Sequence, residues 1–105
     1  MSVQNLVSEL AREYTESKYE KKHLEERISE ILEALLPGIA AIAESKKERE
    51  PVSLWNALKE DEKVKDLFRK ALERIERPIV IYVASKFENN QHFGTRIIEE
   101  ALEWK

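Results

Sequence analysis

Few side chains in this sequence are of the types that carry proton transfer, nucleophilic attack or zinc binding. The chain has two histidines, His23 and His92, and no cysteine. Neither histidine lies in a His-x-x-x-His or His-Glu-x-x-His pattern, so the spacing predicts no zinc site. His92 follows Asn89 and Asn90 in a polar stretch that we expect to be a loop, with a role in recognition or proton transfer. The plainer interpretation of this stretch is an exposed turn.

Carboxylates and glycines give no further sign of catalysis. The pairs Glu25-Glu26 and Glu99-Glu100 are adjacent in sequence, and neighbours on a helix point in different directions. They therefore do not form the facing carboxyl pair that cleaves bonds. The only glycines are Gly38 and Gly94, which rules out a glycine-rich phosphate loop. We predict a protein that is not an enzyme, with no cofactor and no metal.

Basic residues cluster in one stretch that could read DNA. Residues 53–58, a turn at 59–62 and a helix at 63–77 have the lengths of a helix-turn-helix, and a wing after residue 78 would complete a winged-helix regulator. The nucleic-acid contacts would come from the second helix: Lys63, Arg69, Lys70, Arg74 and Arg77. Against this hypothesis, Asp61 and Glu62 stand at the start of that helix, where phosphates would bind. The formal net charge of −3 also disfavours nucleic acid as a partner.

The first predicted structural element is a helix marked by a heptad repeat. Apolar side chains follow 3,4 spacing from Val3 to Leu35, and only Ser17 and Lys21 interrupt it. Such a repeat forms one seam along a helix. We predict a single long helix over residues 1–36, in which positions 3–35 alone would span roughly 50 Å at 1.5 Å per residue. That length exceeds what a compact domain of this size needs.

The heptad seam predicts a homodimer through the first helix. The residues expected at the dimer or partner interface are Val3, Val7, Leu10, Tyr14, Leu24 and Ile28. The alternative is that this helix packs along its length within its own bundle. Leu32 and Leu36 widen the apolar face of the later half, which favours packing in the chain's own core there. The earlier half, Val3 to Tyr14, is the better candidate for contact with a partner. Ser17 and Lys21 would either set the register of a coiled coil or face water.

The remaining sequence predicts shorter helices. Pro37-Gly38 is expected to end the first helix, although a kink with continuation is the alternative. Pro51 and Asp61 suit helix starts, and Thr95 is expected to cap the last helix. Residues 79–84 fit either a buried strand or a buried helix, and the helical neighbours favour the helix. We therefore predict an all-α fold in one domain over residues 1–105. The long N-terminal helix would be followed by a compact bundle of three to five shorter helices over residues 37–105.

Composition sets the remaining limits. Charged residues make up 37% of the chain, well above the usual quarter, and the abundance of Lys and Glu is typical of thermophile proteins or of any solvent-exposed helical protein. No apolar run approaches the roughly 18 residues of a membrane span, and no secretory signal precedes the first helix, so we expect a cytoplasmic protein. The sequence predicts a non-catalytic interaction module with another protein as its target: an adaptor, an assembly subunit or an inhibitor, with a virus-encoded inhibitor as one alternative.

Overall fold

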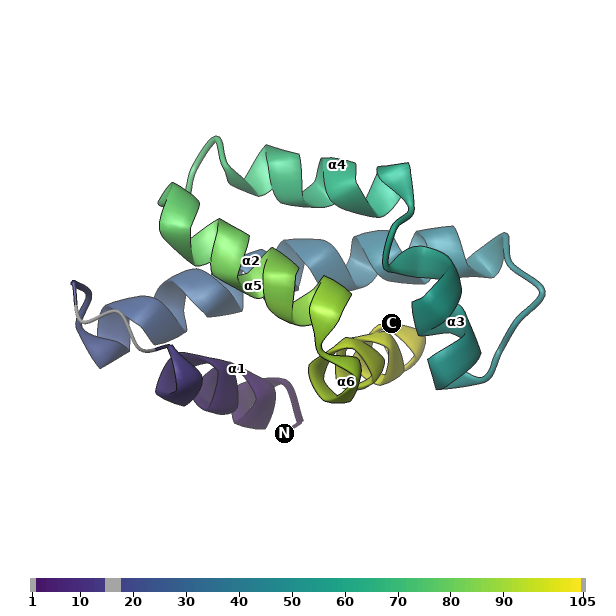
Figure 1. The fold of residues 1–105 in the computed structure, drawn as a ribbon, viewed down its shortest axis with the longest axis horizontal. Helices are drawn as coiled ribbons and strands as arrows, with labels where there is room; N and C mark the ends of the chain where they lie inside the picture. The colour runs from purple at the N-terminus through teal and green to yellow at the C-terminus, as the bar shows by residue number, and fades with distance from the viewer. Residues whose placement is uncertain (1, 15–17, 105) are drawn as a thin grey trace.

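The computed structural model describes residues 2–14 and 18–104, and every regular element in this part of the chain is a helix (Figure 1). The elements are α1 (Ser2–Glu13), α2 (Lys21–Glu44), α3 (Pro51–Leu58), α4 (Glu62–Ala71), α5 (Arg77–Asn89) and α6 (Gln91–Leu102). The prediction of an all-α fold is confirmed. Residues 79–84 belong to α5, so the helical alternative for this segment holds.

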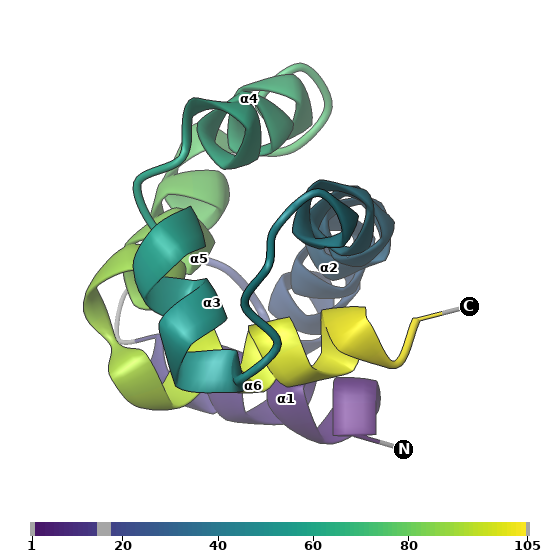
Figure 2. The same ribbon diagram turned by 90° about the vertical axis from the view of Figure 1, so that its right-hand side faces the viewer.

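Helix α2 is the central element. Its 24 residues correspond to roughly 36 Å of helix, in a molecule that measures 41 × 26 × 25 Å. It packs against α1, α4, α5 and α6, whereas α3 packs against α6 (Figures 1 and 2). Buried apolar side chains from all six helices form one continuous core, and no described residue in that core is polar or charged.

The prediction of one uninterrupted N-terminal helix is wrong. Helix α1 ends at Glu13, α2 begins at Lys21, and the two helices pack against each other (Figure 1). Of the two polar residues that interrupt the heptad, Ser17 lies outside the described residues and Lys21 is the exposed first residue of α2. The physical reason is burial: two helices side by side place both halves of the seam in the same core, which one straight helix could not do.

The expected helix end at Pro37-Gly38 is also wrong. The predicted boundary between a long helix over residues 1–36 and a bundle over residues 37–105 therefore falls inside α2. Pro37 lies inside α2, which continues to Glu44. Burial of Ile39 and Ala43 beyond this point offsets the backbone hydrogen bond that proline cannot donate. Gly38 leaves room for α4, because a Cβ atom at this position would lie 2.7 Å from Cδ1 of Leu67.

The later helices begin largely where the sequence predicts. The Asp61 carboxylate accepts a hydrogen bond from the Lys63 backbone N–H at 2.7 Å and caps α4. The helix predicted to run to Arg77 is shorter, however, since α4 ends at Ala71. A turn over residues 72–76 then carries Ile75 into the core before α5 starts.

The loop predicted around Asn89, Asn90 and His92 is absent. Asn89 ends α5, and only Asn90 separates it from α6. The Asn90 side chain accepts a hydrogen bond from the Phe93 backbone N–H at 3.1 Å, so Asn90 caps α6 in place of the predicted cap, Thr95. A single capping residue suffices here because its side chain satisfies a free N–H of the first helical turn.

Gly94 lets the indole of Trp55 pack directly on α6. A Cβ atom on Gly94 would lie 2.5 Å from Cδ1 of Trp55 and closer still to Nε1. The Trp55 Nε1–H donates a buried hydrogen bond of 2.7 Å to the carbonyl oxygen of Phe87. One indole therefore joins α3, α5 and α6.

Candidate protein-binding surface

The residues predicted to form a dimer seam lie mostly inside the molecule. Val7, Leu10, Leu24 and Ile28 are buried, while Val3 and Tyr14 are partly buried against the same core. The outward face of α1 is polar, with Gln4, Asn5 and Arg12 exposed. The structure therefore offers no exposed apolar seam along α1.

Helices α3 and α4 follow each other across residues 59–61, close to the predicted helix-turn-helix, but the second helix is shorter than predicted. Helix α4 packs against α2 and α5, whereas α3 packs against α6. Lys63, Lys70, Arg74 and Arg77 are exposed, but Arg77 belongs to α5. Arg69 forms ion pairs with Asp66 and Glu62. The segment expected to form a wing is α5, so the predicted wing is wrong, whereas DNA binding itself stays a prediction.

The histidines and asparagines do not converge on a cleft. The exposed His92 Nε2 lies 4.0 Å from the Glu9 carboxylate, which Arg96 holds at 2.6 Å. The Asn89 side chain lies 3.5 Å from the Ser85 hydroxyl. Within the described part of the chain, no group of His, Asp and Glu side chains could hold a metal ion. None of the described helices combines the length and apolarity that crossing a bilayer requires.

A different surface has the features of a partner-binding site. It joins the end of α1 to the outer face of α5 around a hollow of about 520 Å³. We call it the tyrosine surface, and its lining residues are Tyr14, Lys18, Arg77, Pro78, Ile81, Tyr82 and Ser85. Ile81 is 48% exposed, and it is one of the few large apolar side chains that the described residues leave open to solvent.

Ring contacts and one hydrogen bond hold the aromatic part of this surface in place. The Tyr14 and Tyr82 rings meet edge to face, with centroids 4.9 Å apart. The Tyr82 hydroxyl donates to the Leu10 carbonyl oxygen at 2.5 Å. Burial, together with the nearby Glu13 charge, raises the pKa of Tyr82 to about 12. At neutral pH the phenol is therefore protonated and able to donate this bond.

The same aromatic cluster extends to the start of α2. The Tyr14 and Tyr19 ring centroids are 6.3 Å apart, and Tyr19 stacks on His23 at 5.6 Å. The His23 Nε2 then lies 2.7 Å from the Glu76 carboxylate, at the residue that precedes α5. These contacts fix the relative positions of α1, α2 and α5 around the hollow.

The tyrosine surface has excess positive charge. Lys18 and Arg77 are exposed and form no ion pair with any described residue. The nearby carboxylates are already paired: Glu13 with Lys86 at 2.8 Å, and Glu76 with His23. The hydrogen bond from Lys86 keeps the pKa of Glu13 below its usual value, so that carboxylate stays ionised and is neutralised by its own partner.

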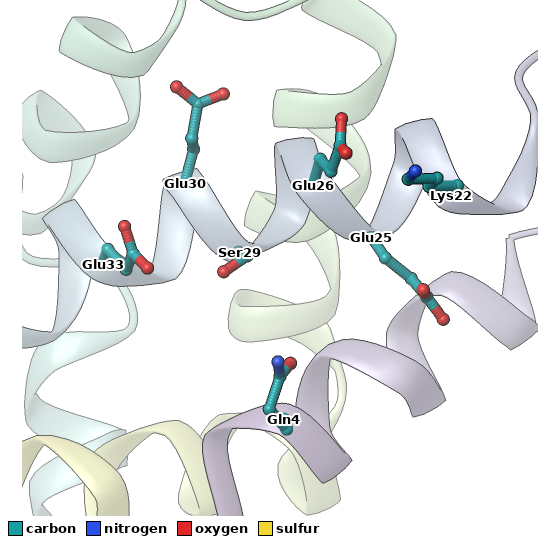
Figure 3. A pocket seen from close by; sticks show the side chains of 7 residues that line it. All are labelled: Gln4, Lys22, Glu25, Glu26, Ser29, Glu30 and Glu33. Atoms are coloured by element: carbon teal, nitrogen blue, oxygen red, sulfur yellow. The ribbon is translucent and has the colours of Figure 1, made fainter.

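A groove between α1 and α2 has the opposite character. It encloses about 430 Å³, and its lining residues are Gln4, Lys22, Glu25, Glu26, Ser29, Glu30 and Glu33 (Figure 3). The carboxylates come from successive turns of α2 and point in several directions, with Glu25 directed toward α1 (Figure 3). This acidic groove has no apolar side chain in its lining, so it lacks an anchor for a partner.

Two further hollows are less complete as binding sites. One of about 390 Å³ lies between α2 and α4, over Ile31 and Leu67, with basic and acidic residues mixed at its rim. The other, of about 140 Å³, lies beside Leu102 and Trp104, which are each 40% exposed. Neither hollow combines an exposed anchor, fixed aromatic walls and one sign of charge.

Comparison with known proteins adds no assignment, because the chain matches no family model, no curated protein and no solved structure. Sequence reasoning named Tyr14 and Arg77 in separate hypotheses but missed the tyrosine surface, because its parts lie far apart in the sequence. One signal was present: with α5 as a helix, positions 78, 81, 82 and 85 share one face, so Ile81 is an apolar residue on an otherwise open side.

Proposed function

We propose that this chain is a non-catalytic protein-interaction module that binds its partner through the tyrosine surface. The observation that carries the proposal is the exposed Ile81 beside the fixed rings of Tyr14 and Tyr82, in a hollow of about 520 Å³. Interface hot spots combine aromatic and arginine side chains at well-packed positions. Rigid aromatic walls also reduce the entropy lost on binding. An adaptor or an inhibitor would use such a surface.

The homodimer predicted through the first helix stays a prediction, and the burial of its expected interface residues argues against that route. Because Val7 and Leu10 are buried, a dimer through the seam would require α1 to leave its own bundle. A dimer through the outward face of α1 would rest on polar residues. We therefore propose another protein, bound at the tyrosine surface, as the principal partner. The cytoplasmic location expected from the sequence remains a prediction.

Affinity capture with matched variants tests the proposal. The purified protein is used as bait in extracts of its source cells, and each recovered protein is then purified and tested for direct binding. Ile81→Asp should abolish binding. Leu102→Asp, which charges a similarly exposed apolar residue that lines a different hollow, should leave binding unchanged. If Leu102→Asp abolished binding and Ile81→Asp did not, the binding site would lie around Leu102 and not on the tyrosine surface.

Light scattering addresses the dimer separately. A monomeric mass that persists at high protein concentration would eliminate the homodimer. A dimer that survives Ile81→Asp would show that copies of this chain associate through another surface. Failure of the bait to bind any protein directly would eliminate the interaction module itself.

A further inference from the structure

We propose that the segment recognised by the tyrosine surface is acidic: a short stretch with one large apolar side chain flanked by Asp or Glu. This inference rests on the proposed function, and it specifies the chemistry of the partner. It follows from how apolar and charged groups are arranged around Ile81.

The centre of the surface selects an apolar side chain. Ile81 is exposed to solvent and lines the same hollow as Tyr14 and Tyr82, whose rings contact each other. The Tyr82 hydroxyl is already used, because it donates to the Leu10 carbonyl. The phenol therefore presents its ring, rather than a free polar group, to the hollow, so contact at the centre gains most from apolar burial.

The rim selects negative charge. Lys18 and Arg77 line the hollow, are exposed and have no ion-pair partner among the described residues. Glu13 is paired with Lys86 at 2.8 Å, and Glu76 has its own neighbours in His23 and, at 3.9 Å, the Arg27 guanidinium. Complementary charge of this kind mainly guides encounter and orientation, and a guanidinium can hold a carboxylate through two parallel hydrogen bonds.

The charge on the rest of the molecule also favours an acidic segment at the tyrosine surface over other places. The whole chain has a formal net charge of −3, and the acidic groove along α2 concentrates four carboxylates: Glu25, Glu26, Glu30 and Glu33. An acidic segment is repelled by that groove and attracted by the exposed cations of the tyrosine surface. A basic segment has the reverse preference, so the two charge types should bind at different places.

Synthetic peptides of equal length test the inference directly. The first carries a Leu-Phe anchor flanked by Glu, the second carries the same anchor flanked by Lys, and the third keeps the Glu flanks but replaces the anchor with Ser. Binding to the full chain is followed by fluorescence anisotropy and by backbone amide NMR shifts. The Glu-flanked anchored peptide should bind, with shifts centred on residues 77–85. The peptide without the anchor should bind there at least about 10-fold more weakly, and the Lys-flanked peptide about 2- to 30-fold more weakly.

Variants then assign the two contributions. Ile81→Asp should weaken the first peptide by about 10-fold or more. The Lys18→Glu, Arg77→Glu double variant should weaken it by about 2- to 30-fold, since each exposed pair contributes about 1.4- to 5-fold. This loss should shrink as salt is raised. Lys47→Glu, in the connector after α2, carries the same charge reversal away from the surface and should have no effect. Circular dichroism checks that each variant is folded.

Three results would overturn the inference. They are equal or tighter binding of the Lys-flanked peptide at residues 77–85, shifts from the acidic peptide centred elsewhere, and no shift at millimolar peptide. The proposed function can survive such a failure. One such case is a captured protein that loses binding with Ile81→Asp while its binding is unchanged by Lys18→Glu and Arg77→Glu. That result would support the proposed function and contradict only the acidic character of the partner. If Ile81→Asp leaves that protein bound, the proposed function itself fails.

Discussion

Replacing Gly94 by alanine tests the packing of Trp55 at the junction of three helices. The added Cβ atom would lie 2.5 Å from Cδ1 of Trp55, and the indole would have to move away from the Phe87 carbonyl that accepts its hydrogen bond at 2.7 Å. Overpacking of this kind costs about 1 to 3 kcal/mol. A buried hydrogen bond left unmade costs about 1 to 3 kcal/mol more. Alanine in place of a helical glycine stabilises the helix by about 1 kcal/mol, which offsets part of this loss.

The net result is a loss of about 1 to 5 kcal/mol, with a central value of about 3 kcal/mol. For a chain of this size, 3 kcal/mol lowers the melting temperature by roughly 10 °C or more. Calorimetry or urea unfolding followed by circular dichroism measures this change. The double variant Gly94→Ala, Trp55→Phe should show coupling, because the smaller ring relieves the clash.

Gly38→Ala is the matched control. This glycine is also helical, but its added Cβ atom would meet only the methyl end of the flexible Leu67 side chain. The helix-propensity gain of about 1 kcal/mol should roughly balance the displacement of that side chain. If Gly94→Ala were as stable as the unchanged protein, or if Gly38→Ala were the more damaging substitution, the packing assigned to Trp55 would be incorrect.

Four further predictions concern single side chains. Tyr82→Phe removes the hydrogen bond to the Leu10 carbonyl and should lower the free energy of unfolding by about 1 kcal/mol, measured in urea. Because the pKa of Tyr82 rises from 10.0 to about 12 on folding, stability should decline as pH rises from about 10 to about 12, and less so in Tyr82→Phe. The pKa of Glu76 is lowered from 4.5, first by its own backbone N–H and then by His23. Glu76→Gln should therefore destabilise the protein at neutral pH, and this difference should vanish in acid, once the pH falls through the lowered pKa of the carboxyl. Pro37→Ala restores a backbone donor within α2 and should raise the unfolding free energy, by at most about 3 kcal/mol.

Local signals in the sequence located many helix starts but not the relation between helices. Pro51 begins α3 and Asp61 caps α4 as expected, because caps and first-turn prolines act within one helical turn. The heptad from Val3 to Leu35 correctly marked buried positions such as Leu10 and Ile28. It could not show whether those positions lie on one straight helix or on two helices folded together, because both arrangements bury the same residues.

Tertiary contacts overrode local rules at two places. Pro37-Gly38 is a strong breaker pair, yet α2 continues because Ile39 lies in the core beyond it. The tyrosine surface depended on the placement of α1 beside α5, which no local pattern encodes. The sequence therefore predicted the fold class and the core well, and it predicted the candidate site poorly.

The attachment of α1 has a consequence for the order in which the protein assembles. Leu10 meets Tyr82 of α5, and Glu9 is held by Arg96 of α6 at 2.6 Å, so α1 is completed by two helices that are synthesised after α2, α3 and α4. At about 5 to 20 residues per second, the ribosome takes roughly 5 to 20 seconds to supply those partners. Throughout that interval the nascent α1 and α2 present the apolar heptad incompletely covered. Elongation speed and chaperone access should therefore influence how much of this protein reaches its native state in the cell.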